Sequence, residues 1–230
     1  MSDIKDAPTS ETALTFGAAD GFGAFTGWEL QSDTPNTQKD RASTTGPTGN
    51  EVSANLHNER TDYSSEYKAS ADSPTIPDTL GKLYNGRVLT SIAVKTSNSD
   101  RATMSLSGHQ HAVNPHADTL QQVEHGIALA TCFGAIDFMA GTGSSGASVA
   151  SGSITIACQH NDALNAAGDH LVGENYTGMM DAQTTWVGTV ATPADTVWDA
   201  TAVEVPVKNT NFVGTSVTGK QPLALASPSA

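Results

Sequence analysis

Two neighbouring runs of alternating apolar and small polar residues constrain the fold more than any other feature of this sequence. The first run, RVLTSIAVKTS, begins at Arg87, and the second, RATMSLSG, begins at Arg101. In the first run, one face of an extended strand would carry Val88, Thr90, Ile92 and Val94. In the second run, Met104 and Leu106 would point into a core while Ser105 and Ser107 face outward. The alternation therefore predicts an antiparallel strand pair joined by a turn at Asn98-Ser99-Asp100.

The same pattern recurs near the other end of the chain. VKTSNSDRATMSLSGHQ begins at Val94, and VKNTNFVGTSVTGKQ begins at Val207. Both open on Val-Lys, run through a Ser/Thr/Asn segment and end on Gln. We therefore expect two related β units. The second would turn near Asn211 and bury Val217 as the first buries Leu106.

A third pattern predicts one long hairpin from Glu29 to Lys68. TTGPTGN, from Thr44 to Asn50, concentrates glycine and proline into a turn, and the following EVSANLH places Val52, Ala54 and Leu56 on one face. The incoming arm is almost wholly polar, so it cannot be a buried central strand. It either projects into solvent or lies against a neighbouring subunit.

The composition favours strands over helical bundles. Hydrophobic residues make up 37% of the chain and charged residues 15%, and Ser, Thr, Gly and Asn fill the difference. We predict a mainly β fold, an antiparallel β-barrel or sandwich of two related units with one short helix, and extended terminal arms. The helix would lie in HADTLQQVEHGIALATCFGAIDFMAG, beginning at His116. The predicted division is an N-terminal arm at 1–28, a first β unit at 29–115, and a second β unit with a C-terminal tail at 116–230.

The charge distribution argues against nucleic-acid binding. The net charge is −13, and only Lys208 and Lys220 are basic after Arg101. A phosphate-binding groove needs clustered Lys or Arg, so we expect no sequence-specific nucleic-acid binding. No apolar run approaches the roughly 20 residues that cross a bilayer, so we expect a soluble protein made in the cytoplasm.

Catalytic signatures are missing from the sequence. It has no G-x-S-x-G elbow, Walker loop, H-E-x-x-H motif or dinucleotide fingerprint. Scattered acids leave a glycosidase pair open. Trp28, Trp186 and Trp198 either stack on sugars or serve as core or interface anchors, and we favour anchors. We predict no enzyme activity, no catalytic residues and no cofactor.

The histidines and cysteines are the remaining candidates for chemistry. His109 and His111 would point the same way from a strand, and His116, His125 and Asp118 follow. Because Pro115 breaks the segment and no cysteine accompanies it, we expect surface or interface histidines and no metal site. Cys132 and Cys158 are expected to be buried apolar side chains, although pairing between them stays open.

The polar arm, the long hairpin, strands of the type VLTSIAVKTSNSDRATMSLSG and the acidic Ser/Thr/Ala-rich surface together resemble structural proteins of tailed-bacteriophage virions. The likeness is greatest to tail tube proteins, over residues 29 to 110 and more weakly over 184 to 221. It implies a subunit that forms a ring or tube in the virion, as a trimer or hexamer, contacting copies of itself and other virion proteins around a lumen through which DNA slides. The implied interface residues are Lys39, Arg41, Glu51, Glu59, Arg60, Trp28, Leu223 and Leu225. A capsid decoration protein and a carbohydrate-binding β-sandwich module of a fibre are the alternatives.

Overall fold

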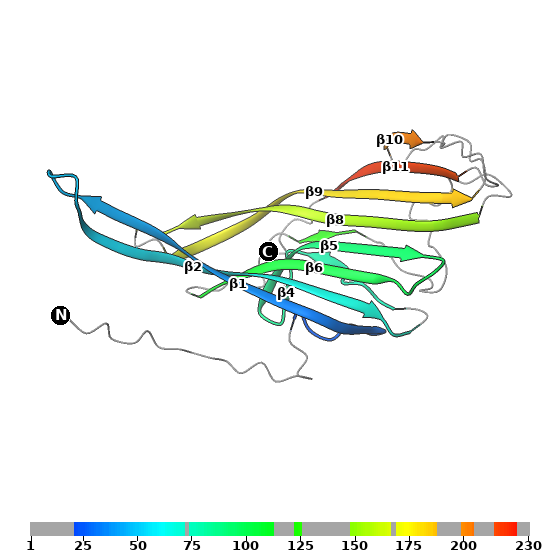
Figure 1. Ribbon diagram of the computed structural model, residues 1–230, viewed down its shortest axis with the longest axis horizontal. Helices are drawn as coiled ribbons and strands as arrows, with labels where there is room; N and C mark the ends of the chain where they lie inside the picture. The colour runs from blue at the N-terminus through cyan, green and yellow to red at the C-terminus, as the bar shows by residue number, and fades with distance from the viewer. Residues whose placement is uncertain are drawn as a thin grey trace.

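A computed structural model describes residues 21–71, 74–112, 122–125, 148–166, 169–187, 199–204 and 214–224 (Figure 1). The strands are β1 (Trp28–Thr45), β2 (Glu51–Ala69), β3 (Thr79–Leu80), β4 (Leu83–Tyr84), β5 (Arg87–Ser97), β6 (Thr103–His111), β7 (Val123–Glu124), β8 (Ser148–Leu164), β9 (His170–Val187), β10 (Asp199–Glu204) and β11 (Gly214–Leu223). Over these residues the fold is mainly β, as predicted. They contain no helix, and therefore none that is long and apolar enough to span a membrane.

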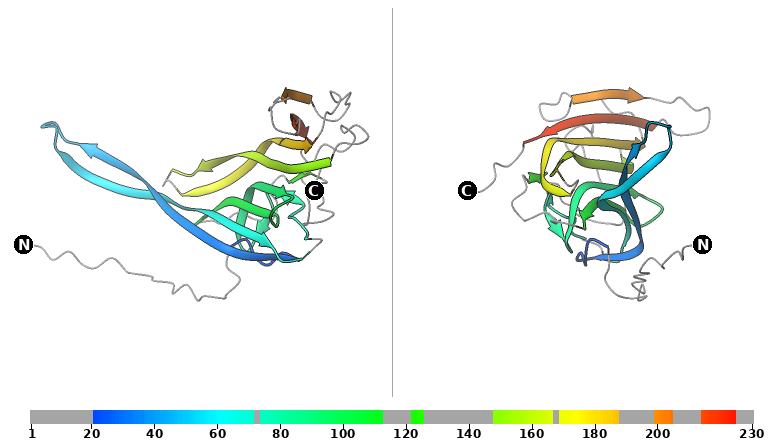
Figure 2. Two further views of the ribbon diagram at one scale, coloured as in Figure 1. Left: turned by 45° about the vertical axis from the view of Figure 1, so that its right-hand side comes forward. Right: turned by 90° about the vertical axis from the view of Figure 1, so that its left-hand side faces the viewer.

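Most of the strands belong to one antiparallel sheet. Its nine strands run in the order β1-β2-β6-β5-β8-β9-β11-β10, with β4 paired to β5, while β3 and β7 form a separate pair. The sheet curls strongly when viewed along its length (Figure 2). The path nevertheless has two ends, at β1 and β10, and no closed barrel forms among the described strands. The predicted antiparallel β class is confirmed, and the predicted barrel is not found.

The core lies inside the curl. It collects the inward side chains of β5, β6, β8 and β9, among them Ile92, Met104, Leu106, Ile154 and Ile156. Ser105 and Ser107 are exposed and Val217 is buried, as the alternation predicts. One detail differs, because a bulge between Leu89 and Ser91 takes Thr90 out of register. Leu89 therefore joins Ile92 and Val94 in the core in the place where the sequence predicts Thr90.

The end of the N-terminal arm docks on this core. Phe22 is buried, and its backbone N–H donates to the Tyr67 hydroxyl at 3.1 Å. The space for its ring exists because residue 108 is glycine. A Cβ there would lie 1.9 Å from the Val88 carbonyl oxygen and 2.9 Å from the Phe22 ring. Within the predicted arm, residues 21–27 are thus fixed to the sheet, and residues 1–20 lie outside the described part.

A buried ion pair ties β1 to β5 beneath the arm. Arg87 Nη1 donates to both carboxylate oxygens of Asp33, each at 3.0 Å. Ser65 also donates to this carboxylate, at 2.6 Å, and the Arg87 guanidinium lies 3.7 Å from the centroid of the Tyr63 ring. The polar strand β1 is therefore held by a specific polar network where it crosses the core.

The predicted long hairpin is confirmed as β1 and β2, but only part of it is supported by the rest of the sheet. β6 pairs with β2 from Arg60 to Lys68, and beyond Arg60 the two strands pair only with each other. A bulge marks the boundary, where Asn58 and Glu59 lie opposite Lys39 and Asn58 has a left-handed φ of 50°. The outer half projects well past the body of the sheet (Figures 1 and 2).

The two segments expected to be copies both lie in strand pairs. β5 pairs with β6, and β10 pairs with β11 from Asp199↔Lys220 to Glu204↔Ser216. Lys95 lies within its strand, whereas Val207, Lys208 and Asn211 lie outside the described residues. The duplication and the division into two units therefore stay predictions, although one sheet contains the strands of both. The predicted helix also lies mostly outside the described residues, and its described piece, Val123–Glu124, is strand.

Candidate functional site

The outer half of the β1–β2 hairpin is the most exposed element that the structure describes. Within the described residues, no strand pairs with the free edge of β1. Val52 and Leu56, on the predicted apolar face, are 67% and 60% exposed. An isolated two-stranded ribbon is marginally stable in water, and an unpaired edge is a template for another chain. This segment has the features of a contact surface.

The residues predicted for an interface fall into three environments. On the outer hairpin, Lys39 pairs with Glu59 at 2.8 Å and Arg41 pairs with Glu51, all partly exposed. Arg60 sits at the hairpin base. Trp28 is buried in the core and donates from Nε1 to the Thr75 carbonyl at 2.9 Å, so it offers little surface to a partner. Leu223 packs against the core, and Leu225 lies outside the described residues.

A second two-stranded ribbon lies near the first. β8 pairs with β5 only up to Ala157, and β9 pairs with β11 only from Gly178 onward. Past these points β8 and β9 pair only with each other, and the change is again marked by a bulge, at Thr177 with φ 49°. This ribbon carries His160 near its base, Asp162 farther along β8, and His170 at its tip, where β9 begins.

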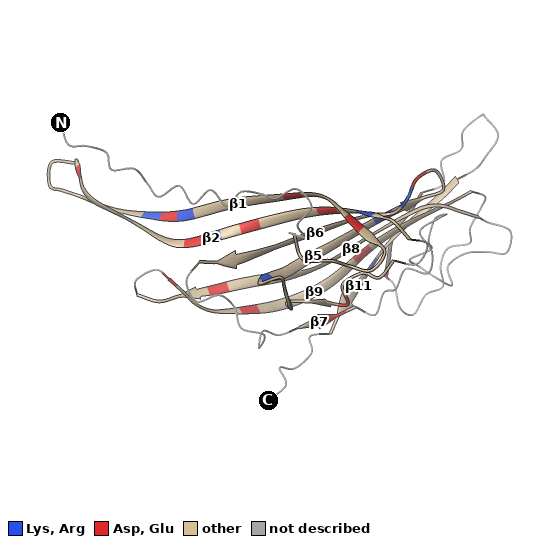
Figure 3. Ribbon diagram, turned by 90° about the horizontal axis from the view of Figure 1, so that it is seen from below, with Lys and Arg blue, Asp and Glu red and all other residues tan. Residues whose placement is uncertain are grey.

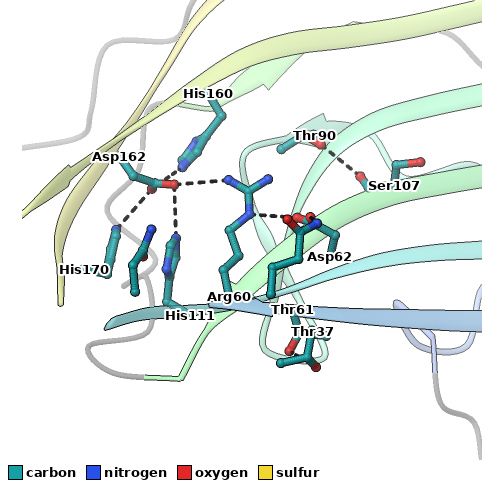
Figure 4. A network of polar contacts seen from close by, with 12 residues as sticks. Thr37, Arg60, Thr61, Asp62, Thr90, Ser107, His111, His160, Asp162 and His170 are labelled. Atoms are coloured by element: carbon teal, nitrogen blue, oxygen red, sulfur yellow. Dashed lines mark hydrogen bonds and ion pairs between the residues drawn. The ribbon is translucent and has the colours of Figure 1, made fainter. Parts of the chain in front are cut away.

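These residues meet the two histidines of β6. His111 Nε2 lies 3.1 Å from Asp162 Oδ2, while His160 Nε2 and His170 Nε2 lie 2.8 and 3.3 Å from Asp162 Oδ1. The rings of His111 and His170 stack with centroids 4.2 Å apart and planes 14° apart. The His109 ring lies 4.4 Å from that of His160. Figure 4 shows the Asp162 side chain surrounded by His160 of β8, His170 of β9, His111 of β6 and Arg60 of β2.

The burial of the β6 histidines follows from this overlap. His109 and His111 share the strand face of Ser105 and Ser107, opposite Met104 and Leu106. That face is exposed at both serines, yet His109 and His111 are only 3% and 2% exposed. The β8–β9 ribbon covers this end of β6. Of the expected surface or interface location, the surface alternative is therefore wrong for both histidines.

The central carboxyl is held in its ionised form. Burial acts to raise the pKa of Asp162, but hydrogen bonds from His111 and His160, together with their charge, outweigh it and hold that pKa well below its usual range. Arg60 Nη1 adds a cation 3.6 Å from Asp162 Oδ2. Behind the cluster, His160 Nδ1 lies 2.7 Å from the Asn175 side-chain oxygen. This contact fixes the orientation of the His160 ring, in which Nε2 faces the carboxylate.

An open pocket of about 370 Å³ adjoins the cluster. Its lining includes Arg60, Asp62 and His109 from the cluster side, and Thr34 and Asn36 from β1. It gives solvent and small ions a route to the base of the hairpin.

Two groups of side chains have the ligand types and spacing of a metal site. They are His109 with His160 and Asp162, and His111 with Asp162 and His170; in each group the ligand atoms lie within 4.8 Å of one another. His125, another candidate from the sequence, is not part of either group and bonds the Pro77 carbonyl at 2.6 Å. His116 and Asp118 lie outside the described residues.

Sequence reasoning missed His160, Asp162 and His170. The sequence did contain a signal. His109 and His111 are two residues apart, and so are His160 and Asp162, and each pair lies at the end of an alternating run or directly after it. A spacing of two residues in a strand shows that the two side chains of each pair point to the same face. It does not show that β8 would pass over β6, since β5 separates them in the sheet.

The other sequence candidates are placed as follows. Trp28 and Trp186 are buried core residues, which excludes them from stacking on sugars, and Trp198 lies outside the described residues. Cys158 is a buried free thiol, as expected for an apolar role, and Cys132 is also outside the described residues.

No protein-family model matches this chain, and no curated protein sequence matches it significantly.

Proposed function

We propose that this protein is a non-enzymatic structural subunit that assembles with copies of itself into a ring or tube, in the manner of tail tube or head-tail connection proteins of tailed-bacteriophage virions. The observation that carries the proposal is the outer β1–β2 hairpin. From Lys39 to Leu56 it extends beyond the strand that supports its base, and among the described strands β1 and β2 pair there only with each other.

Energetics favour a partner for this hairpin. Ordering the backbone costs about 1–2 kcal/mol per residue, and exposed ion pairs such as Lys39–Glu59 return less than about 1 kcal/mol each. The exposed side chains of Val52, Ala54 and Leu56 contribute no hydrophobic stabilisation until another surface covers them. A contact with a second chain supplies the missing burial.

The favoured occupant is a second copy of this chain. The protein carries a net charge of −13, so two copies repel over most of their surface. From Lys39 to Glu51 the hairpin carries Lys39, Asp40, Arg41 and Glu51, two of each sign, which sum to zero (Figure 3). The exposed Leu171 and Val172 on the β8–β9 ribbon offer a complementary apolar surface. A heterologous contact between hairpin and ribbon would close into a ring or extend as a tube.

The remaining acidic surface suits a lumen that DNA passes without being gripped, because like charges keep a polyanion mobile. A capsid decoration protein is the second candidate, since it would use the same exposed edge on a shell. A carbohydrate-binding module is disfavoured by the burial of Trp28 and Trp186.

Sedimentation velocity over a concentration series tests the proposal. The wild-type chain is expected to form discrete oligomers, and deletion of Thr44 to Asn50 is expected to leave a folded monomer. A double variant, Val52→Lys with Leu56→Lys, should weaken assembly in the same way. Gln31→Lys with Ser105→Lys adds the same charge to exposed sites on the supported part of the sheet and should leave it intact. Unchanged oligomers in the deletion variant would refute the role of the hairpin.

A further inference from the structure

The geometry points to a binding site for one divalent transition-metal cation, with His111, Asp162 and His170 as its protein ligands. This site is independent of self-assembly. It differs from the expectation of no metal site, which considered only the segment around His109 and His111 and not the residues of β8 and β9 that meet it.

The ligand distances fit the chemistry. Zinc binds imidazole nitrogen at about 2.0–2.1 Å and carboxylate oxygen at about 2.0–2.2 Å, so a tetrahedral ion holds a nitrogen and an oxygen about 3.3 Å apart. The Nε2 atoms of His111 and His170 lie 3.1 and 3.3 Å from the Asp162 carboxylate. The two rings are nearly parallel and stacked, with centroids 4.2 Å apart, so one ring must turn about its side-chain bonds before both Nε2 lone pairs meet at one ion.

The surroundings complete the site. Side chains of both histidines are at most 3% exposed, and that of Asp162 is 12% exposed, so water competes weakly for the ion. His160 contacts Asp162 Oδ1 and is itself oriented by Asn175. Such outer partners orient ligands in known metal sites. A pocket lined by Arg60, Asp62 and His109 lies beside the cluster, and three protein ligands leave the fourth position of a tetrahedral ion for water.

Charge also permits binding. Asp162 is the one carboxylate in the ligand set, and Arg60 lies 3.6 Å from it. Arg60 has a closer partner in Asp62, at 2.7 Å, with which it stays paired when a cation takes its place at Asp162. Two imidazoles with one carboxylate favour Zn²⁺ and its neighbours Co²⁺, Ni²⁺ and Cu²⁺ over Ca²⁺ or Mg²⁺, which prefer all-oxygen sites.

The ion would join β6 to the β8–β9 ribbon, which β5 separates from β6 in the order of the sheet. His111 lies on β6, Asp162 on β8 and His170 on β9. Metal binding would therefore fix the β8–β9 ribbon against the base of the β1–β2 hairpin, and its free energy would add to the stability of the fold.

The test uses the full chain without a polyhistidine tag, because a tag binds the same ions. Protein stripped with a chelator is titrated with Zn²⁺ and passed through a desalting column, and its metal content is measured. One Zn²⁺ per chain and a rise in Tm of several degrees are expected, with no effect of Ca²⁺. With Co²⁺, the visible absorption bands of a four-coordinate ion are expected. An absence of stoichiometric Zn²⁺ binding by the folded wild type would overturn the proposal.

Variants test the ligand assignment. Asp162→Asn, His111→Gln and His170→Gln should each weaken Zn²⁺ binding by more than about 100-fold, and His160→Gln by about 10–100-fold. His125→Gln removes a buried histidine outside the cluster and should bind as the wild type does. His109→Gln should also retain the ion. If His109→Gln loses the ion while His111→Gln keeps it, the assignment to His111 and His170 is wrong. Circular dichroism checks that each variant is folded. If a variant does not fold, the Co²⁺ spectrum of the wild type still tests whether the chain binds a four-coordinate ion.

Discussion

Arg60 Nη1 on β2 lies 3.6 Å from Asp162 Oδ2 on β8, although β6 and β5 separate these strands in the order of the sheet. The contact exists because β8 and β9 continue past the end of their pairing with β5 and pass over the end of β6. Both ribbons leave the sheet at a bulge with a left-handed residue, Asn58 in one and Thr177 in the other. The histidine cluster lies where the β8–β9 ribbon, from His160 to His170 at its tip, meets the base of the β1–β2 hairpin.

The ion pair between Asp33 and Arg87 should be essential to the fold. Asp33→Ala leaves the Arg87 guanidinium, whose side chain is 11% exposed, without its carboxylate. Removing one partner of a buried pair costs about 3–5 kcal/mol. Chemical denaturation should show a loss of this size, against less than about 1 kcal/mol for Lys39→Ala in an exposed pair. Equal effects of the two variants would contradict this role.

Gly108 should tolerate no side chain. In Gly108→Ala the new Cβ meets the Val88 carbonyl, which is backbone and cannot rotate away. We expect a loss of about 1–3 kcal/mol or more in the free energy of unfolding, measured by urea titration. Gly214→Ala is the matched control, because its Cβ would make an ordinary contact at 3.5 Å. A Gly108→Ala protein as stable as this control would show that Phe22 does not pack here as described.

Cys158 should be an unreactive thiol. Burial raises its pKa to about 11, so at pH 8 only about one thiol in a thousand is the reactive thiolate. In a Cys132→Ser background, which leaves one cysteine, alkylation of the native protein should be far slower than that of the unfolded protein. Its rate should rise about tenfold per pH unit. Equal rates for folded and unfolded protein would place the thiol at the surface.

His125 should make the fold less stable in acid. Burial lowers its pKa below the usual 6.5, an effect larger than the opposing hydrogen bond to the Pro77 carbonyl. A base with a depressed pKa is neutral in the folded state and takes up a proton more readily when unfolded. Its contribution to stability is therefore full above about pH 6.5 and is lost as the pH falls through that value and toward the folded-state pKa. His125→Gln should lose about 1 kcal/mol at pH 7.5 from the hydrogen bond but show a smaller decline from pH 7 to pH 5. A decline identical to that of the wild type would exclude His125 as a source of acid sensitivity.

Local periodicity predicted the local structure well. Alternation identified β5, β6 and β11, and the Gly/Pro cluster located the turn of the long hairpin, because both signals act between residues that are close in sequence. The bulge at Thr90 was not predictable, since it depends on how Val88 and Leu89 pair with His109 and Gly108 across the strand.

Long-range relations were out of reach. The buried pair of Asp33 and Arg87 joins residues 54 positions apart, and Asp162 meets His111 across 51. The polar composition of β1 correctly indicated an exposed strand, but one of its polar side chains, the Asp33 carboxylate, is buried. The histidines were misjudged for the same reason, because their burial comes from a ribbon that no local pattern connects to them.

The central claim is that the chain assembles through its projecting hairpin. Electron microscopy of the purified wild-type protein tests it most directly. We expect rings or tubes of uniform diameter that disappear when Thr44 to Asn50 are deleted. A wild-type sample that contains only monomeric particles, at concentrations where the protein is folded, would contradict it.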